Sequence, residues 1–432
     1  MNKPVNANQE FQSDFLSVTE ARTAISAVIH SIQAQARLHE AIESLPLKEC
    51  LGRILASDVL SPINVPANDN SAMDGFAFNG KELDAAQDPV NLRIAGAIYA
   101  GQTHSPSIQM GECIKVMTGA MMPPNCDTVI PQEFTKSSEE GSITFAKDTV
   151  RAGDNRRLCG EDLQAGKPAI QRGRILKASD IGLAASLGIA KLEVYQRIKV
   201  AILSSGDELC SIGVPLQPSK IYDSNRFSLH ACLSKLGFEI IDCGIVHDTP
   251  DDLRQAFMQA AQKADVIISS GGVSVGEADF TKQIMEELGQ VGFWKIAMRP
   301  GRPMAFGSLK PVSPKTAPTV FFGLPGNPVA VMVTFYQFVR NALLHLNGAL
   351  NPEIPLVSIQ SAEAIRKKSG RTEFQRGILF RDPEGRLLVK STGSQGAGIL
   401  RSMSEADCFM ILHHHQGNIA PGDWVDVEIF DG

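Results

Sequence analysis

Carboxylate side chains follow the apolar, strand-like segments between residues 197 and 280. Asp207 and Glu208 come after KVAILSSG, Asp248 ends EIIDCGIVHD, and Asp279 opens the helical segment DFTKQIMEELGQ. The carboxyl ends of parallel strands meet at one edge of an open α/β sheet, where such sheets bind ligands. A few carboxylates, completed by water and phosphate oxygens, suit Mg²⁺. The pattern indicates a magnesium–phosphate site, although each acid taken singly is more typical of a helix N-cap or a solvated turn.

The segment Ser269–Phe280, SSGGVSVGEADF, joins one of these strands to the next helix. Gly271 and Gly272 allow successive backbone N–H groups to converge on an anion, and the helix that follows adds partial positive charge. The alternative is a plain glycine turn. The stretch around Ser274 also matches the GxSxG nucleophile elbow of serine hydrolases. That reading needs a later acid and a loop histidine, and His345 and the tract His413–His415 are poor candidates.

Three cations occur in the segment KIAMRPGRP, namely Lys295, Arg299 and Arg302. The Pro-Gly break prevents a helical face, so the segment is typical of a rigid basic loop suited to a tetrahedral oxyanion or a phosphate. A solvated strand end is the alternative. The turn LPGNP follows a buried strand, and its two prolines, Pro325 and Pro328, make it stiff enough to pack against a ligand or to serve only as a connector.

Other polar turns could likewise be functional or only structural. Asp74 lies in SAMDG, Thr118 in MTGA and Asp162 in GEDL, and each could act in a site or only shape a turn. The tract His413–His415 could suggest a metal, but it lies beside a strand, so a solvent-facing edge is favoured. Neither HExxH nor GxxxxGK[ST] is present, which disfavours a zincin and a Walker-type kinase.

The elements that must position these residues fall into four groups. Strands alternate with helices in residues 197–347, which predicts an open, mostly parallel α/β sheet. Short strands with turn residues predict a β-rich domain in 62–150 and a small C-terminal β-barrel in 348–432. Residues 15–61 and 151–196 form the predicted helical and linker domain, interrupted by the β-rich insertion. Within it, Ser17-Val-Thr-Glu20 is typical of a capping box that begins a helix.

Composition limits the class of protein. The chain has 432 residues, 43% of them hydrophobic, and a net charge of −6, which argues against nucleic acid as the main partner. The polar N-terminus lacks a secretory pattern, and no apolar run of about 18 residues predicts a membrane helix. The 8 cysteines form no CxxC pair, which favours reduced thiols and a cytoplasmic location.

Taken together, the motifs resemble one family closely. They occur in its order from about residue 15 to the C-terminus: DNSAMDGFA, MTGAMMP, RRLCGEDL, SSGDEL, IYDSN, SSGGVSVGEADF, MRPGRPMAFG and LPGNPV. The chain resembles the molybdopterin molybdenumtransferases (MoeA and the gephyrin E-domain). The resemblance implies insertion of molybdate into adenylylated molybdopterin with Mg²⁺ and release of AMP. It also implies a homodimer, with a cleft shared between subunits, and transient contact with the molybdopterin adenylyltransferase.

The resemblance also implies roles for single residues. Acidic functional residues are expected at Asp74, Asp162, Glu208, Asp248 and Asp279, with Asp248 and Asp279 near Mg²⁺. Substrate-binding residues are expected at Thr118, Gly271, Gly272, Ser274, Lys295, Arg299, Arg302, Pro325, Pro328 and Arg371. Arg299 and Arg302 stand where the family pattern has lysine, and Ala397 where it has serine.

Two other functions fit the same sequence. An adenylyltransferase or pyrophosphatase could use the same α/β domain, although the SAMDG motif and the additional domains favour the molybdenumtransferase. A catalytically idle pterin-binding or scaffold protein is the other alternative, and the acids Asp74, Asp248 and Asp279 argue against it.

Overall fold

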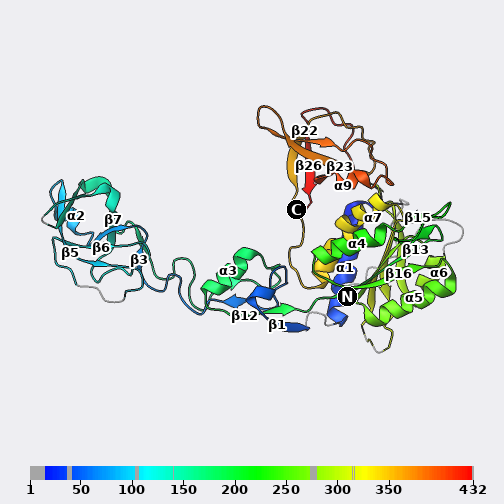
Figure 1. Ribbon diagram of the computed structural model, residues 1–432, viewed down its shortest axis with the longest axis horizontal. Helices are drawn as coiled ribbons and strands as arrows, with labels where there is room; N and C mark the ends of the chain where they lie inside the picture. The colour runs from blue at the N-terminus through cyan, green and yellow to red at the C-terminus, as the bar shows by residue number, and fades with distance from the viewer. Residues whose placement is uncertain are drawn as a thin grey trace, which may run out of the picture. The chain divides into compact units, whose positions relative to one another are not determined.

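The computed structural model describes residues 15–36, 41–102, 107–139, 141–272, 280–313, 315 and 317–430. Ser274 and Asp279 lie outside these residues. The chain divides into two compact units (Figure 1). The first contains the chain up to Ser57, residues 173–177, and everything from Lys191 on. The second contains Asp58–Arg172 and Ala178–Ala190. The four-domain boundaries expected from the sequence stay a prediction.

The central element of the first unit is a six-stranded α/β sheet. Its strand order is β16 (Glu239–Val246), β13 (Lys199–Ser205), β17 (Val266–Ser270), β21 (Thr319–Leu324), β20 (Pro303–Leu309) and β18 (Gly289–Lys295). The first four strands are parallel, and β20 and β18 continue the sheet antiparallel. Helices α4 (Asn225–Lys235), α5 (Pro250–Lys263) and α6 (Phe280–Leu288) lie between strands in the chain. This confirms the predicted open, mostly parallel sheet.

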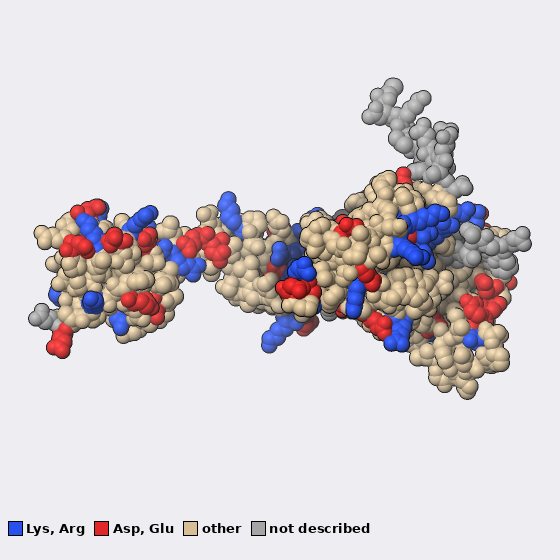
Figure 2. Space-filling model, turned by 90° about the horizontal axis from the view of Figure 1, so that it is seen from above, with Lys and Arg blue, Asp and Glu red and all other residues tan. Residues whose placement is uncertain are grey.

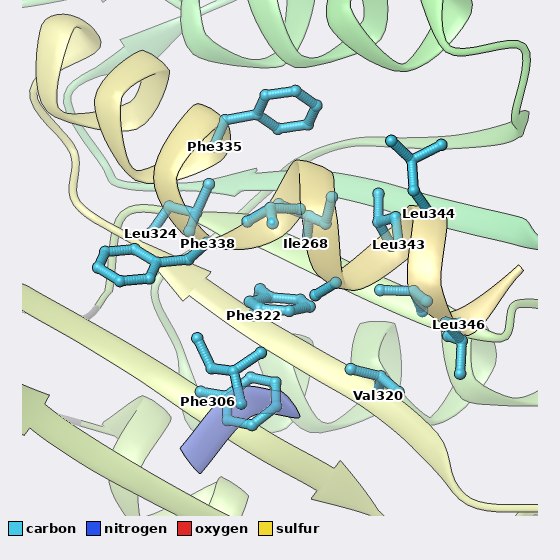
Figure 3. Packing of buried hydrophobic residues seen from close by; sticks show 14 of the residues in the cluster. Ile268, Phe306, Val320, Phe322, Leu324, Phe335, Phe338, Leu343, Leu344 and Leu346 are labelled. Carbon is cyan, nitrogen blue, oxygen red and sulfur yellow. The ribbon is translucent and has the colours of Figure 1, made fainter. Parts of the chain in front are cut away.

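Both faces of this sheet are buried, which explains the continuous apolar runs of its strands. Along β13, Val200 and Ile202 belong to one hydrophobic cluster, while Ala201 and Leu203 belong to another. The first cluster includes residues of α4, and the second includes residues of α5 and α6. Figure 3 shows the first cluster around Phe322, with side chains of the sheet facing a long apolar helical segment.

That helical segment follows the LPGNP turn. It consists of α7 (Pro328–Thr334), the π-helical turn η5 (Phe335–Val339) and α8 (Arg340–Leu346). By length and composition alone Pro328–Leu346 could cross a membrane, but 78% of its apolar window is buried inside the protein. Its apolar character is therefore explained by packing on the sheet.

Helix α1 (Val18–Ala36) completes the same core. The predicted capping box is present: the Ser17 N–H donates to Glu20 Oε2 (2.7 Å), and the Glu20 N–H donates to Ser17 Oγ (3.2 Å). Ile25, Ile29 and Ile32 recur at helical spacing, and all three are buried in the cluster that contains Phe322. The helix is thus fixed at its start by polar caps and along one side by the α/β core.

The C-terminal part of the first unit is a closed five-stranded barrel, as predicted. Its strands are β23 (Thr372–Arg381), β24 (Leu387–Ser391), β22 (Val357–Ser361), β26 (Trp424–Ile429) and β25 (Cys408–Leu412), and pairing of β25 with β23 closes the ring. The short strand β19 (Met298–Arg299) adds to β23 in parallel. A separate pair, β1 (Ile42–Pro46) with β12 (Lys191–Tyr195), is antiparallel.

The second unit is β-rich, as expected. Its six-stranded sheet has the order β7 (Thr128–Pro131), β4 (Gly75–Phe78), β6 (Glu112–Val116), β5 (Val90–Ile98), β9 (Ser142–Phe145) and β8 (Lys136–Ser137). Two-stranded pairs join β2 (Val59–Leu60) to β11 (Pro168–Ile170) and β3 (Asn70–Ser71) to β10 (Arg156–Arg157). The helices are α2 (Glu82–Ala85) and α3 (Ala178–Ser186). Acidic and basic side chains both occur on the surface of each unit in the face shown in Figure 2.

Candidate functional site

The glycines after β17 are required by the backbone. Gly271 and Gly272 have φ of 91° and 67°, in the left-handed region that glycine favours. A Cβ on Gly271 would stand 2.3 Å from the Ser205 carbonyl oxygen of the neighbouring strand. A Cβ on Gly272 would stand 2.7 Å from Thr281 Oγ1 and 2.9 Å from Ser205 Oγ. The loop therefore lies closely against β13 at the carboxyl edge of the sheet.

Asn225 connects this loop to the LPGNP turn. Its Nδ2 donates to Ser270 Oγ (2.8 Å) and to the Gly326 carbonyl (2.7 Å). The Gly271 N–H donates to the Leu324 carbonyl (3.1 Å), so the two segments are also joined directly. Asn225 lies in the IYDSN motif, but its role as a link depends on contacts with residues 45 and 101 positions away, which local sequence patterns cannot show.

The prolines of the turn have different surroundings. Pro325 is buried, and Pro328 begins α7, where its missing N–H leaves no helical hydrogen bond unmade. Both therefore stabilise the turn that Asn225 contacts. A direct role in ligand binding remains a prediction.

Replacing Asn225 tests this link. Asn225→Ala should destabilise the fold by about 1–3 kcal/mol because the Gly326 carbonyl and Ser270 lose their donor. Asn225→Asp should destabilise the fold further, since a carboxylate oxygen would then face the Gly326 carbonyl oxygen. Urea unfolding measures both, and the exposed Asn91→Ala on β5 serves as control. Equal stability of the parent and the Asp variant would contradict the assigned link.

Three of the acids named from the sequence gather at the same edge of the sheet. Burial raises the pKa of Asp248, and the negative charges of Asp207 and Glu208 raise it further. Asp207 and Glu208 follow β13, and Asp248 follows the adjacent strand β16. The structure therefore brings Glu208 and Asp248 close enough to repel each other. Among the described residues, no group of three His, Cys, Asp or Glu side chains is arranged to hold a metal by itself.

Asp223, the acid of the IYDSN motif, has a structural role. Its carboxylate accepts from Ser204 Oγ (3.0 Å) and pairs with Arg226 (3.0 Å). It is 1% exposed, so its charge is neutralised within the fold.

The predicted basic residues separate into different surroundings. Lys295 ends β18 and is exposed. Arg302 stacks over the Phe15 ring (4.7 Å to the centroid), whereas Arg371 pairs with Glu373 (2.7 Å). Arg302 and Arg371 both line a cavity of about 850 Å³ beside the start of α1.

Arg299 lies near a cation that the sequence reading did not single out. Arg376 is fully buried in β23, and burial together with the charge of Arg299 lowers its pKa to about 10. Its Nε donates to Ser402 Oγ (3.0 Å) and its Nη2 to the Gly396 carbonyl (3.2 Å). Arg376 thus fixes the loop that carries Ala397, whose carbonyl accepts from the Val329 N–H of α7 (3.0 Å). The sequence does not single out Arg376, because a buried arginine leaves no local signal in the chain.

The second unit brings its own motifs together. The Asp74 carboxylate accepts from the Thr118 N–H (2.7 Å) and from Thr118 Oγ1 (2.6 Å), and these bonds lower the pKa of Asp74. The pair β3–β10 places the chain before SAMDG beside the RRLCGEDL segment. Asp162 is exposed in a turn, and its backbone N–H donates to the Val65 carbonyl (3.0 Å). Asp74 and Thr118 therefore form a direct pair, while Asp162 has no described bond to either.

The pair predicts a pH effect. Thr118→Val removes the hydroxyl donor, the largest cause of the lowered Asp74 pKa, so that pKa should rise toward its usual range near 3.9. Because a lowered folded-state pKa keeps the carboxylate ionised at lower pH, the variant should protonate Asp74 earlier on acidification. NMR titration of the side-chain carboxyl in both proteins measures this shift. Thr135→Val is the control, because the described hydrogen bond of the Thr135 hydroxyl is to the Gln132 carbonyl and not to a carboxylate.

Three protein-family models match the chain in succession. The MoeA N-terminal region (domain I and II) matches residues 16–188, a probable molybdopterin binding domain matches 201–345, and the MoeA C-terminal region (domain IV) matches 358–430. The matches together cover both units and the barrel.

Individual proteins are similar over most of their length. A molybdopterin molybdenumtransferase of Haemophilus influenzae is 42% identical over 390 residues, covering 90% of this chain and 94% of the relative. One from Nostoc sp. is 35% identical, covering 84% and 82%. A crystal structure of a molybdopterin biosynthesis MoeA protein from Pyrococcus horikoshii matches with a TM-score of 0.69 and 29% identity, covering 97% of this chain and 100% of that one.

Proposed function

Since the chain belongs to the MoeA family of molybdenum cofactor biosynthesis enzymes, we propose that it inserts molybdate into adenylylated molybdopterin and releases AMP. The observation that carries the proposal is the loop at Gly271 and Gly272, held against β13 so closely that a Cβ on Gly271 would meet the Ser205 carbonyl at 2.3 Å. The loop lies at the carboxyl end of parallel strands, where a phosphate can be bound, and there the Gly272 N–H would be the donor, since the Gly271 N–H donates to the Leu324 carbonyl.

The residues around the loop suit this reaction. Molybdate is already an oxyanion and the pterin supplies the sulfur ligands, so the protein mainly has to position both and neutralise charge. Gly272 and Ser274 would bind the phosphates, and Gly271 would shape the loop while its N–H stays bonded to the Leu324 carbonyl. Asn225 would keep the loop and the LPGNP turn at a fixed separation. Lys295, Arg299, Arg302 and Arg371 would serve the oxyanion, and Asp74, Thr118 and Asp162 belong to the proposed set as well.

Mg²⁺ fits the donor set at the sheet edge. Burial raises the pKa of Asp248, and repulsion from the charges of Asp207 and Glu208 raises it further. A divalent cation would relieve that repulsion. Mg²⁺ usually takes one or two carboxylates and fills its other positions with water and phosphate oxygens. We propose that Asp248 and Asp279 hold the ion, which when bound would neutralise phosphate charge.

Turnover decides the proposal. The full-length protein is incubated with adenylylated molybdopterin and Mg²⁺, with and without molybdate, and AMP is measured by chromatography. Molybdate-dependent AMP release is the expected result. AMP release that is the same without molybdate would indicate a pyrophosphatase, and no release at all would favour a pterin-binding scaffold. Either outcome would overturn the proposal.

The proposed assembly is a homodimer in the cytoplasm that receives its pterin from a molybdopterin adenylyltransferase. Light scattering of the purified protein should give about twice the subunit mass of 46.5 kDa. A mass equal to one subunit at micromolar concentration would contradict this prediction.

A further inference from the structure

The histidine tract lines the same cavity as two of the basic residues. His413, His414 and His415 directly follow β25, and the cavity of about 850 Å³ also contains Arg302, Lys368 and Arg371 in its wall. The sequence favoured a solvent-facing edge for the tract. The structure agrees that His413 and His415 are exposed, but it also assigns all three side chains to one concave surface.

The two barrel loops that form this wall are fixed to each other. Lys367 is 5% exposed, and its Nζ donates to the carbonyls of Arg371 (2.7 Å) and Gln416 (3.1 Å). The Gly370 N–H donates to the His414 carbonyl (3.0 Å). These hydrogen bonds fix the position of the cavity wall, and the exposed Lys368 lies in the chain between Lys367 and Gly370.

The charges around the cavity favour an anion. Arg371 is neutralised by the buried Glu373. The described contact of Arg302 is with the Phe15 ring, and an aromatic ring does not neutralise its charge. Glu20 lines the cavity with one oxygen engaged in the α1 cap. Asp426 accepts from Ser358 Oγ (2.7 Å) and hydrogen-bonds His413 Nε2 (2.8 Å). Both of these carboxylates, the ones that the described residues place beside the tract, therefore already have hydrogen-bond partners, and the pairing of His413 with Asp426 leaves His414 and His415 to face an anion.

His414 is the half-buried member of the tract. Its Nδ1 is buried and has no hydrogen-bond partner among the described residues. The ring packs edge-on against His415, with centroids 5.1 Å apart. The hydrogen bonds from Ser17 are the main cause of the lowered pKa of Glu20, and the neighbouring His414 lowers it further by a smaller amount.

We propose that His414 and His415, with His413 held beside them by Asp426, extend the basic wall at Arg302 and Lys368 into a binding site for a tetrahedral oxyanion, whose affinity falls as the imidazoles lose their protons. The inference rests on the proposed function for the identity of the oxyanion, which would be molybdate. Imidazoles are the side chains that change charge at roughly pH 5 to 8, so they would make capture of the oxyanion dependent on pH in that range. Glu20, Asp426, Arg302, Lys367, Lys368 and Arg371 are the other charged groups of the elements around them, and carboxylate, lysine and arginine side chains as classes ordinarily titrate outside that range.

Calorimetric titration of the full-length protein with sodium molybdate tests the site. Between about pH 6 and about pH 8 the parent should lose about fivefold in affinity, the effect of one or two half-exposed charge pairs. A variant with all three histidines replaced by Gln should bind at about pH 6 as weakly as the parent does at about pH 8. His230→Gln, an exposed histidine of α4, should behave as the parent. Equal affinity and an equal pH slope in the parent and the triple variant would overturn the proposal.

Two further measurements separate the explanations. Titration with AMP in place of molybdate should show no dependence on the histidines, and a histidine-dependent affinity for AMP would instead assign the cavity to a phosphate ester. Thermal unfolding detects a merely structural role, which would lower the melting temperature without changing the pH slope. Because molybdate binding needs no pterin, loss of AMP release with normal molybdate binding would contradict the proposed function and leave this inference standing.

Discussion

Replacing Asp248 by Asn should lower turnover by about 10²–10³-fold while leaving the fold as stable as the parent or slightly more stable. The loss of activity follows from the proposed position of Asp248 beside Mg²⁺ and phosphate. The stability effect has the opposite sign because the ionised Asp248 is disfavoured by burial, Asp207 and Glu208. A residue that only supported the fold would lose stability and activity together.

Molybdate-dependent AMP release and urea unfolding measure the two effects in the same preparation. Asp251→Asn is the matched control, since Asp251 lies three residues away with a side chain that is 96% exposed. It should change neither quantity appreciably. Unchanged turnover in Asp248→Asn would favour the scaffold alternative.

The pH dependence of stability has a defined sign at Asp248. A carboxyl whose folded-state pKa is raised contributes stability that is fully present below its unfolded pKa, near 3.9, and is lost as pH rises through the folded pKa. At neutral pH the ionised group therefore destabilises the protein. Asp248→Asn removes this contribution, so the stability difference between the variant and the parent should be largest at neutral pH and vanish below about pH 4.

Gly271→Ala should be the most destabilising single change in the loop, at about 3–5 kcal/mol, with turnover reduced at least ~100-fold. Two independent costs combine. The φ of 91° is unfavourable for alanine, and the added Cβ would stand 2.3 Å from the Ser205 carbonyl of β13, a sheet strand that cannot easily move. Urea unfolding gives the stability, and AMP release gives the turnover.

Gly385→Ala separates these two costs. Gly385 has a similar φ of 82°, but an added Cβ there would meet nothing within 4 Å. The free energy of unfolding of this variant should fall by only about 1 kcal/mol, the cost of the backbone conformation alone. If Gly271→Ala cost no more than this control, the close approach of the loop to β13 would have no energetic weight.

Much of the fold was accessible from the sequence because its determinants are local. The capping box at Ser17 and Glu20, the apolar runs of β13 and β17, and the alternation of strands with helices each lie within one element. The family motifs extended these local patterns into a full architecture, and the mostly parallel sheet and the closed barrel agree with it.

The candidate site was accessible only in part, because it depends on contacts between distant residues. That Asp248 repels Glu208 could be expected from adjacent strand ends. The link from Asn225 to Gly326 and the burial of Arg376 beside Arg299 could not, since no spacing in the chain encodes them. The same holds for His413–His415, whose neighbours in the cavity come from the start of α1 and the β19 region.

Helix α1 has a consequence for biosynthesis. Its apolar side chains, such as Ile25 and Ile29, share a core with Phe322 and Leu343, which lie roughly three hundred positions later in the chain. A ribosome adding about 5–20 residues per second would expose this helix for some tens of seconds before its partners are made. During that interval either a chaperone or the solubility of the segment itself has to prevent the exposed apolar side of α1 from aggregating. Slow codons after residue 36 should therefore lower the soluble yield more than slow codons placed after residue 346.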